Sequence, residues 1–544
     1  MERDWRIWNA LIGTTFIVAM VYMIAPEMNF CQGTRAPRVP FSSLVRMTLM
    51  DRPHLSKSAG KSNAVSCSFG GNPATNINLR CGELTHPYAE TAIAVDPSDP
   101  NHLLVGANDY RPADSTFVTV GFFVSFNGGT TWVAGNVPIN GDAAADPSPV
   151  FNAKFGTAHM GQVDVECPRL RYLRTCAYSA EVSTSGDGGL IWRRPVIVAQ
   201  GSGFLRVLND KPWLVADNDS SSPFYGRLYL TWTRFLLTKA GDGVSSPINL
   251  SYSDDDGGTW TPGIEISGTN AAFCTASAEY RCQDDQFSTP VVLPGGVVVV
   301  HFLNANNAAG WEIPLEFDTQ TMVVRSTNGG VSWSAPLHTA DLEDGNGDLP
   351  TNVNDYYTQT GHQFTTWSVQ GMTVDPITGI LYAFWIDNRD GIHDSLSPVT
   401  QTNVFMTRSS DGGLSWTSPL RVTSGPGDRW MAWGGAYGGA VRVMFMDGSY
   451  DYPNRTQYGM TLASSSDSGG TWSFQRVDTS SSNPNNSFWF KSFVNDCFLC
   501  TTLIGDYQGM TVDSLGRTHI VWTDMRRNIG NPPSKAHDVQ YARR

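Results

Sequence analysis

The sequence has no excess of basic residues: 37 Lys and Arg stand against 50 Asp and Glu, for a formal net charge of -13. Because nucleic-acid phosphates are bound by basic surfaces, this balance argues against a nucleic-acid partner. Long helical patterns are also few, whereas 53 glycines and 17 tryptophans are present. Such a composition favours many short strands joined by turns, in a globular all-β protein.

The N-terminus lacks charge from Ile7 to Ala25, which is 19 residues and enough to cross a bilayer as a helix. It also lacks a small-x-small cleavage site, because Met23 and Ala25 occupy the two key positions. We therefore expect a cytoplasmic tail over 1–6, a transmembrane signal-anchor helix over 7–25 and an extracytoplasmic stalk over 26–74. A cleaved signal peptide is the alternative.

Cysteine is sparse but patterned. Eight of the nine cysteines form close sequence neighbours: Cys67 with Cys81, Cys167 with Cys176, Cys274 with Cys282, and Cys497 with Cys500. No histidine is interleaved with these pairs, which favours disulfides in an oxidising compartment over metal binding. This predicts a periplasmic or extracellular location for the bulk of the chain. Cys31 is left over and has no lipobox before it.

An octet of the form Ser-x-(Asp/Asn)-x-Gly-x-(Ser/Thr)-Trp, with small variations, occurs six times. The copies start at Ser125, Ser185, Ser253, Ser326, Ser409 and Ser465. Its third residue is Asn127, Asp187, Asp255, Asn328, Asp411 or Asp467. Asp, Asn and Gly suit a tight turn between two strands, and the Trp ring can be buried beneath it. A catalytic carboxylate could not be replaced by Asn, so the octet is interpreted as structural.

A second pattern, strand-turn-strand, precedes most octets, as in "GMTVDPITGILYAFWIDNR" over 371–389. Together the two patterns give four-stranded meanders, which can be arranged radially as a β-propeller. The octets resemble the Asp-boxes, or BNR repeats, of the sialidase superfamily over residues 125–472, and the resemblance implies the same fold. We expect a seven-bladed propeller over 75–544, with a strand from 75–81 completing the last blade. Six blades, as in true sialidases, is the alternative.

Meander geometry predicts two rings of polar residues at the mouth of the propeller. The first ring lies where the innermost strands begin: Glu90, Asp146, Asp210, Lys211, Asp285, Gln286, Gln370, Asp506 and Tyr507. The second lies where the second strands end: Asp109, Arg111, Arg234, Asp387, Arg389, Asp447, Asp524 and Arg526. Carboxylates and guanidinium groups on a concave surface can hold a polar ligand. The repeated Asp-x-Arg motif can equally form salt bridges between blades.

The resemblance to sialidases implies three arginines, a Tyr nucleophile assisted by Glu, and an Asp acid/base. In this chain Arg111, Arg389, Arg526, Tyr507 and Asp506 would take these roles. The family's Arg-Ile-Pro motif is missing, with Arg38-Val39-Pro40 and Tyr110-Arg111-Pro112 as the nearest matches. No glutamate follows Glu343, so the Glu partner would be Glu279, Glu312 or Glu316.

The stretch "DLEDGNGDLP" over 341–350 resembles a calcium loop, with Asp341, Glu343, Asp344, Asn346 and Asp348 as oxygen donors. An ordinary acidic turn is the alternative, and no other cofactor is expected. The preferred functional hypothesis is a membrane-anchored recognition or docking module that binds envelope or membrane proteins or a glycan. A sialidase-like exo-glycoside hydrolase is the competing hypothesis, and a calcium-stabilised adhesin is a third.

Overall fold

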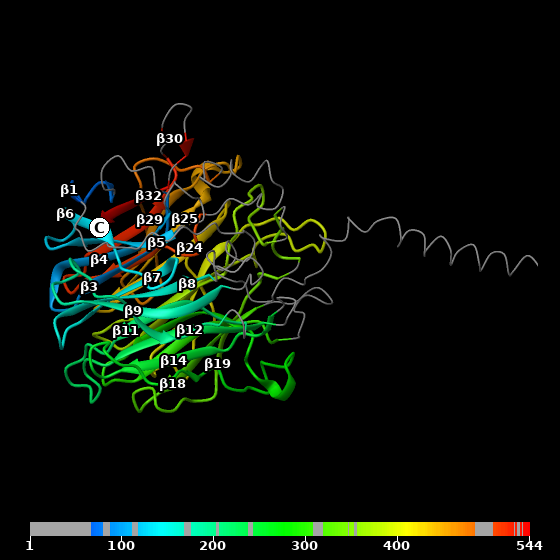
Figure 1. Ribbon diagram of the computed structural model, residues 1–544. Helices are drawn as coiled ribbons and strands as arrows, with labels where there is room; N and C mark the ends of the chain where they lie inside the picture. Colours follow the sequence, from blue (N-terminus) through cyan, green and yellow to red (C-terminus); the bar gives the residue numbers. More distant parts are fainter. Residues whose placement is uncertain are drawn as a thin grey trace, which may run out of the picture.

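A computed structural model describes residues 67–544 except 80–86, 111–117, 168–175, 203–205, 238–242, 308–318, 346, 353–355, 485–503, 527, 530–533 and 536. The described residues form β-strands with two short 3-10 turns, η1 (Ala278–Tyr280) and η2 (Gly448–Asp451), as the all-β prediction requires (Figure 1). None of the helical turns in these ranges has the length or apolar character to span a bilayer. The tail, the anchor expected over 7–25, Cys31 and most of the stalk lie outside the described residues.

The strands form antiparallel meanders in chain order. The first sheet has the order β1 (Cys67–Gly70), β6 (Thr131–Asn136), β5 (Val118–Ser125), β4 (Asp99–Tyr110), β3 (Tyr88–Asp96). The second meander contains β7 (Ala143–Asn152), β8 (Thr157–Glu166), β9 (Ala177–Ser185) and β10 (Val196–Ala199). The third contains β11 (Val207–Ala216), β12 (Leu228–Leu237), β14 (Ile248–Ser253) and β15 (Ile264–Glu265), with β13 (Gly243–Ser245) beside β12. A parallel bridge between Leu208 and Tyr178 joins these two meanders.

Four further meanders follow. The fourth contains β16 (Asp285–Val292), β17 (Val298–Asn304), β18 (Gln320–Ser326) and β19 (Leu337–Asp341). The fifth contains β20 (Val369–Val374), β21 (Leu381–Asp387), β22 (Asn403–Ser409) and β23 (Leu420–Arg421). The sixth contains β24 (Arg429–Tyr437), β25 (Ala440–Asp447), β26 (Gly459–Ser465) and β27 (Ser473–Arg476). The last contains β28 (Gly509–Val512), β29 (Thr518–Asp524), β32 (Asp538–Arg543) and β2 (Ile77–Asn78), and a small hairpin of β30 (Asn528–Ile529) and β31 (Ser534–Lys535) lies apart.

The first strands of the meanders contact one another in a closed sequence: β3 with β7, then β11, β16, β20, β24, β28 and β3 again. This ring of four-stranded sheets is consistent with a β-propeller. The inner strands of the sheets are buried on both faces and are mostly apolar without alternation. Every residue of β17 and β21 is buried, for example, whereas every residue of the outermost strand β27 is exposed. Five tryptophans are fully buried in these sheets: Trp132, Trp232, Trp385, Trp430 and Trp522.

The two ends of the described chain meet in the last sheet. β2 pairs antiparallel with β32, with Ile77 opposite Tyr541, and Leu79 N–H donates to the Val539 carbonyl at 2.7 Å. The Tyr541 ring then packs edge-on against Trp132 of the first sheet, with ring centroids 4.8 Å apart. β1 lies on the outer edge of the first sheet, so among the described residues sheet structure is present from Cys67, inside the segment 26–74 expected to be a stalk.

The six octets form the same turn each time, between the third and fourth strands of their meanders. The Ser hydroxyl donates to the Asp or Asn side chain at 2.7–3.1 Å and accepts from the N–H of the fifth residue at 2.8–2.9 Å. The same Asp or Asn oxygen accepts from the N–H of the seventh residue at 2.8–3.0 Å. Because either side chain supplies this acceptor, the turn tolerates Asn.

Two of the expected disulfides are present, Cys167–Cys176 and Cys274–Cys282. Each closes a short loop, and both agree with folding in an oxidising compartment. Cys81, Cys497 and Cys500 lie outside the described residues, so the other two expected pairs stay predictions.

Candidate binding site

A β-bulge interrupts the first strand of six meanders near its start. The pairing shifts register between Ala89 and Ala92, and at the matching places in β7, β11, β16, β20 and β24. Five residues at these bulges have a positive φ of 50–59°: Glu90, Asp146, Lys211, Phe287 and Met431. Non-glycine residues adopt this backbone conformation only under strain, and bulges redirect side chains. The repeated bulge therefore turns chosen side chains out of the normal strand alternation.

Three of these side chains, together with Asp506, make one buried charge cluster. Lys211 Nζ lies 3.4 Å from Glu90 Oε2, 3.2 Å from Asp146 Oδ1 and 3.2 Å from Asp506 Oδ2. All four side chains are at most 4% exposed. Asn108 braces the cluster, since its Nδ2 donates to Glu90 Oε2 at 2.8 Å and its Oδ1 accepts from the Asp146 N–H at 2.9 Å. We call these four charged residues the Lys211 cluster.

Aromatic rings surround the Lys211 cluster. Lys211 Nζ lies 4.5 Å from the centre of the Tyr507 ring, and Tyr507 packs edge-on against Trp213 at 5.5 Å. Trp213 in turn contacts Trp433 at 4.9 Å, and Trp367 Nε1 donates to Asp506 Oδ1 at 3.1 Å. An ammonium over an aromatic face gains a cation–π contact in addition to its ion pairs.

The charges of the cluster depend on one another. Burial raises the pKa of Glu90 well above its usual value, although the nearby Lys211 charge lowers it. Burial likewise raises the pKa of Asp146, against the same lowering effect of Lys211. Burial alone would lower the pKa of Lys211, but Asp146, Glu90 and Asp506 together raise it. Lys211 therefore stays charged, and it is the cation that keeps three buried carboxyl groups compatible with the fold.

The rest of the first predicted ring does not join this cluster directly. Asp210 accepts from Gln286 Nε2 at 2.8 Å, and Asp285 accepts from Asn304 Nδ2 at 2.6 Å. Burial raises the pKa of Asp285 well above its usual value. The side chain of Gln370 lies outside the described residues.

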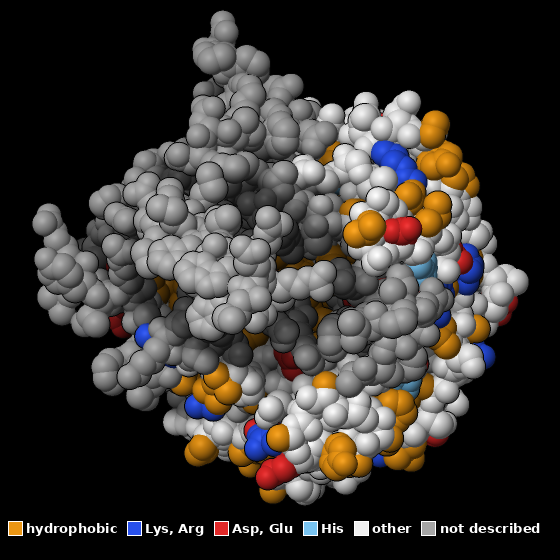
Figure 2. Space-filling model, turned by 90° about the vertical axis from the view of Figure 1, so that its right-hand side faces the viewer, with side chains coloured by type: hydrophobic (Ala, Val, Ile, Leu, Met, Phe, Trp, Pro, Cys, Tyr) orange, Lys and Arg blue, Asp and Glu red, His pale blue; other side chains and the backbone are white. Residues whose placement is uncertain are grey.

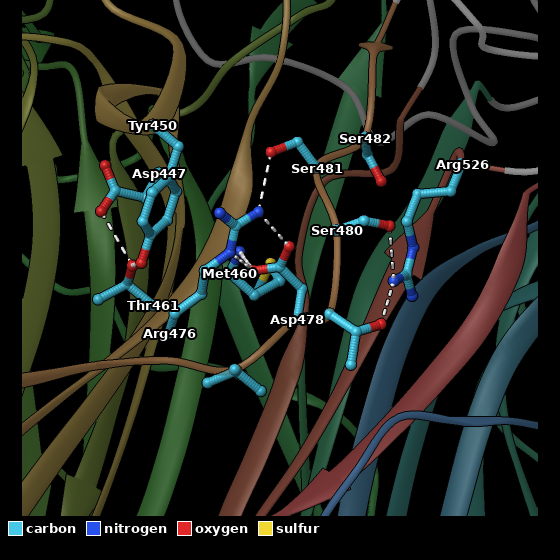
Figure 3. Close-up of polar contacts among 12 residues, drawn as sticks. Asp447, Tyr450, Met460, Thr461, Arg476, Asp478, Ser480, Ser481, Ser482 and Arg526 are labelled. Atoms are coloured by element: carbon cyan, nitrogen blue, oxygen red, sulfur yellow. Dashed lines mark hydrogen bonds and ion pairs between the residues drawn. The ribbon is translucent and has the colours of Figure 1, made fainter.

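The second predicted ring is held in local pairs. Arg389 and Arg526 form ion pairs with Asp387 and Asp524, two residues earlier in the chain, and Arg429 Nε lies 3.3 Å from Asp447. Arg526 also reaches the loop after β27, where it donates to Thr479 at 2.8 Å and Ser480 at 3.3 Å (Figure 3). The Asp-x-Arg motifs thus form ion pairs within one strand end, and Arg526 additionally ties two sheets together.

The remaining members of the second predicted ring do not form Asp-x-Arg ion pairs among the described residues. Asp109 accepts from Asn136 Nδ2 at 2.8 Å, and Arg234 is partly buried at the end of β12. Arg111 lies outside the described residues.

Only part of the group set proposed for a sialidase-type reaction lies in the described residues, so that assignment stays a prediction. Tyr507 is 5% exposed and its hydroxyl donates to the Pro147 carbonyl at 3.3 Å. Burial, and then the charges of Asp146 and Glu90, raise the pKa of Tyr507 well above its usual value, which disfavours the phenolate needed for nucleophilic attack. Arg389 and Arg526 belong to different sheets, each paired with its own aspartate. Glu279 lies exposed in η1, and Glu312 and Glu316 lie outside the described residues.

A groove of about 640 Å³ lies between the outer part of the fourth meander and the octet turn of the fifth. Its walls include Phe273, His338, Asp341, Glu343, Arg389 and Trp416. Phe273 and His338 are stacked with centroids 4.3 Å apart, and the partly exposed guanidinium group of Arg389 lies 4.4 Å above Phe405. The groove therefore combines flat rings with charged and hydrogen-bonding groups.

The five oxygen donors expected to make a calcium loop are not all directed to one point. Asp344 turns away and accepts from the Thr319 hydroxyl at 2.8 Å, while Asp341 bonds His338 at 2.8 Å. Asn346 lies outside the described residues. The carboxylates of Glu343 and Asp348 instead lie near His393, which the sequence pattern did not include.

Sequence reasoning also missed the groups around the Lys211 cluster, namely Asn108, Trp213, Trp367 and Trp433. One signal was present: Asp146 and Lys211 each precede a proline where an innermost strand was expected to begin. In the structure these prolines lie inside β7 and β11, and proline in a strand interior marks a bulge, where the side chains change direction. On the face seen in Figure 2, the described Lys, Arg, Asp and Glu side chains stand scattered among one another, so the charge pattern of that face gives no further pointer to a site.

No protein-family model and no curated protein matches this chain. Among solved structures, a Hadza microbial sialidase, Hz136, is similar at 13% identity and TM-score 0.40, covering 93% of this chain and 98% of its own. A protein of unknown function from Dyadobacter fermentans is similar at 10% identity and TM-score 0.42, covering 87% and 98%. A polysaccharide lyase, an ulvan lyase of family PL25, is similar at 9% identity and TM-score 0.43, covering 84% and 94%. Sialidases are thus among the structural neighbours, as the octets predict, and at these identities no residue role is carried over.

Proposed function

We propose that this chain is a seven-bladed propeller that acts outside the cytoplasm as a recognition module and binds a glycan in the groove between its fourth and fifth meanders. The observation that carries the proposal is the groove itself. It brings Phe273, His338 and Trp416 together with Asp341 and Arg389 around one open space. A sugar ring can pack its C–H face on the flat aromatic groups while its hydroxyl groups bond the carboxylate and guanidinium groups.

The state of the Lys211 cluster and of Tyr507 supports binding rather than hydrolysis. The carboxyl groups of Glu90, Asp146 and Asp506 surround one lysine, and Tyr507 covers that lysine with its ring. Each of these groups is buried and engaged with another protein group. The arrangement suits a structural plug at the centre of the ring, because Lys211 offsets part of the carboxylate charge and the raised pKa values of Glu90 and Asp146 favour their neutral forms.

The location is part of the proposal. Two disulfides favour an oxidising compartment, and the apolar segment 7–25 would hold the propeller at the membrane surface. A membrane-held glycan binder suits an accessory subunit of an envelope complex. Its other partners would then be membrane or envelope proteins.

A glycan array followed by titration calorimetry tests the binding site. Trp416→Ala removes a groove wall, whereas Trp472→Ala removes the equivalent tryptophan of the next octet, which is not a wall of the groove. We expect Trp416→Ala to weaken binding by about 10-fold or more, as loss of an aromatic contact worth about 1.4 kcal/mol does, with Trp472→Ala within about 2-fold of wild type. Binding to no glycan, or equal loss in both variants, would overturn the proposal.

A further inference from the structure

Three potential metal ligands from two loops meet beside the groove. Glu343 and Asp348 belong to the loop after β19, and His393 to the loop after β21. One ligand atom from each lies within 4.8 Å of the other two. Asp348 is fully buried, and the His393 side chain is 12% exposed. We propose that Glu343, Asp348 and His393 bind a divalent first-row transition-metal ion, of which zinc is the best probe.

The hydrogen bonds around the histidine fix its orientation. His393 Nε2 lies 2.8 Å from the Asn388 carbonyl, to which it can only donate. In the neutral ring, Nδ1 then carries the lone pair, and it faces Asp348 Oδ1 at 3.1 Å. A histidine that ligates a metal through one nitrogen commonly donates its other N–H to a backbone carbonyl. The contact between the lone pair of Nδ1 and the carboxylate is favourable only with a cation between them, or with His393 protonated.

The carboxylate is oriented in the same way. Asp348 Oδ2 accepts from the Gly345 N–H at 3.0 Å, which directs Oδ1 toward His393. Three further bonds hold the two loops together: Asn388 N–H to the Glu343 carbonyl at 2.8 Å, Asn388 Nδ2 to the Asp348 carbonyl at 2.6 Å, and Asp394 N–H to the Gly347 carbonyl at 2.9 Å. The ligands therefore approach one another within a braced pair of loops, which lowers the entropic cost of binding.

The donor set decides the class of metal. Calcium prefers sites made of oxygen atoms alone, whereas imidazole suits zinc and its neighbours. Metal–ligand bonds of about 2.0–2.2 Å place neighbouring ligand atoms about 3–3.5 Å apart, which the contact between His393 and Asp348 matches. Three protein ligands leave coordination positions open, and Glu343 also lines the groove.

Metal content and affinity test the proposal on the full chain in detergent, after removal of metal with a chelator. Wild type is expected to bind one zinc ion per chain, measured by mass spectrometry and by competition with a chromophoric chelator. His393→Gln and the isosteric Asp348→Asn should weaken zinc binding by at least about 100-fold, since loss of even an outer hydrogen-bond partner costs about 10- to 100-fold. His338→Gln is the matched control, because His338 also pairs with a carboxylate of the groove, that of Asp341.

Three results would overturn the proposal. They are binding of neither zinc nor manganese by wild type, unchanged zinc affinity in both ligand variants, and stoichiometric binding of calcium alone. Circular dichroism of each variant checks folding, and the wild-type measurement stands even if a variant does not fold. The proposal goes beyond glycan binding and is measured without any glycan, so the two proposals can fail separately.

Discussion

Replacement of Lys211 by methionine removes the only cation of the Lys211 cluster and leaves Glu90, Asp146 and Asp506 buried around an apolar chain. At an effective dielectric constant of about 20, unit charges about 3 Å apart interact by about 5 kcal/mol, and desolvation of the ammonium group offsets much of this. Removing one partner of a buried ion pair costs about 3–5 kcal/mol, so Lys211→Met should lower the free energy of unfolding by this amount at pH 8.

The loss of unfolding free energy in Lys211→Met should increase as the pH rises. The folded-state pKa values of Glu90 and Asp146 are raised above their unfolded values by burial, and Lys211 lowers them. In the variant they rise further. A carboxyl group with a raised folded pKa contributes stability below its unfolded pKa of about 4, and this contribution is lost as pH rises toward the folded pKa. The deficit of Lys211→Met should therefore be small near pH 4 and largest at pH 8.

Urea unfolding at pH 4 and pH 8, followed by tryptophan fluorescence, measures the loss of unfolding free energy in Lys211→Met and its dependence on pH. Lys154→Met is the matched control, because Lys154 is exposed and its Nζ bonds only the Tyr225 carbonyl at 2.9 Å among described polar groups. It should change the free energy of unfolding by about 0.5 kcal/mol or less. A deficit under about 1 kcal/mol at pH 8, or an equal deficit at both pH values, would refute the reasoning.

Two further predictions concern other parts of the fold. Burial, and then the Asp164 charge, raise the pKa of Glu181 to about 8, so wild type loses stability as pH rises from about 4.5 to 8. Glu181→Gln should remove this loss and exceed the wild-type free energy of unfolding by about 4–5 kcal/mol at pH 9 but not at pH 4.5 in urea titrations, and parallel pH profiles would contradict it. In the fifth octet, Asp411 accepts from the N–H groups of Leu414 and Ser415 at 3.0 Å. Asp411→Ala should cost about 1–2 kcal/mol and Asp411→Asn less than half of that, whereas equal losses would show that charge rather than the acceptor matters.

The strands and turns could be predicted from the sequence because their causes are local. Each octet carries its own hydrogen-bond acceptor, glycine and tryptophan, so the turn at Ser409 forms from the residues within it. The strand patterns likewise predict the meanders. The pairing of Ile77 with Tyr541 joins distant parts of the chain, and it could be expected only from counting which meander lacked a strand.

The Lys211 cluster and the proposed metal ligands were harder to predict because their convergence depends on geometry that no local pattern encodes. Lys211 and Glu90 are 121 residues apart and meet because both lie on bulges of a closed ring. In the acidic loop over 341–350, the spacing predicted five calcium ligands that the structure does not bring together. Asp344 instead accepts a hydrogen bond from the Thr319 hydroxyl. His393 lies in another loop and carried no signal at all.

Turnover of a fluorogenic sialoside tests most directly whether the Lys211 cluster and Tyr507 are structural rather than catalytic. The assay compares purified wild type with Tyr507→Phe, which removes only the hydroxyl group bonded to Pro147. We predict that wild type releases no more fluorophore than the variant and the buffer blank. Robust release by wild type that disappears in Tyr507→Phe would contradict the assignment and identify the buried cluster as an active site.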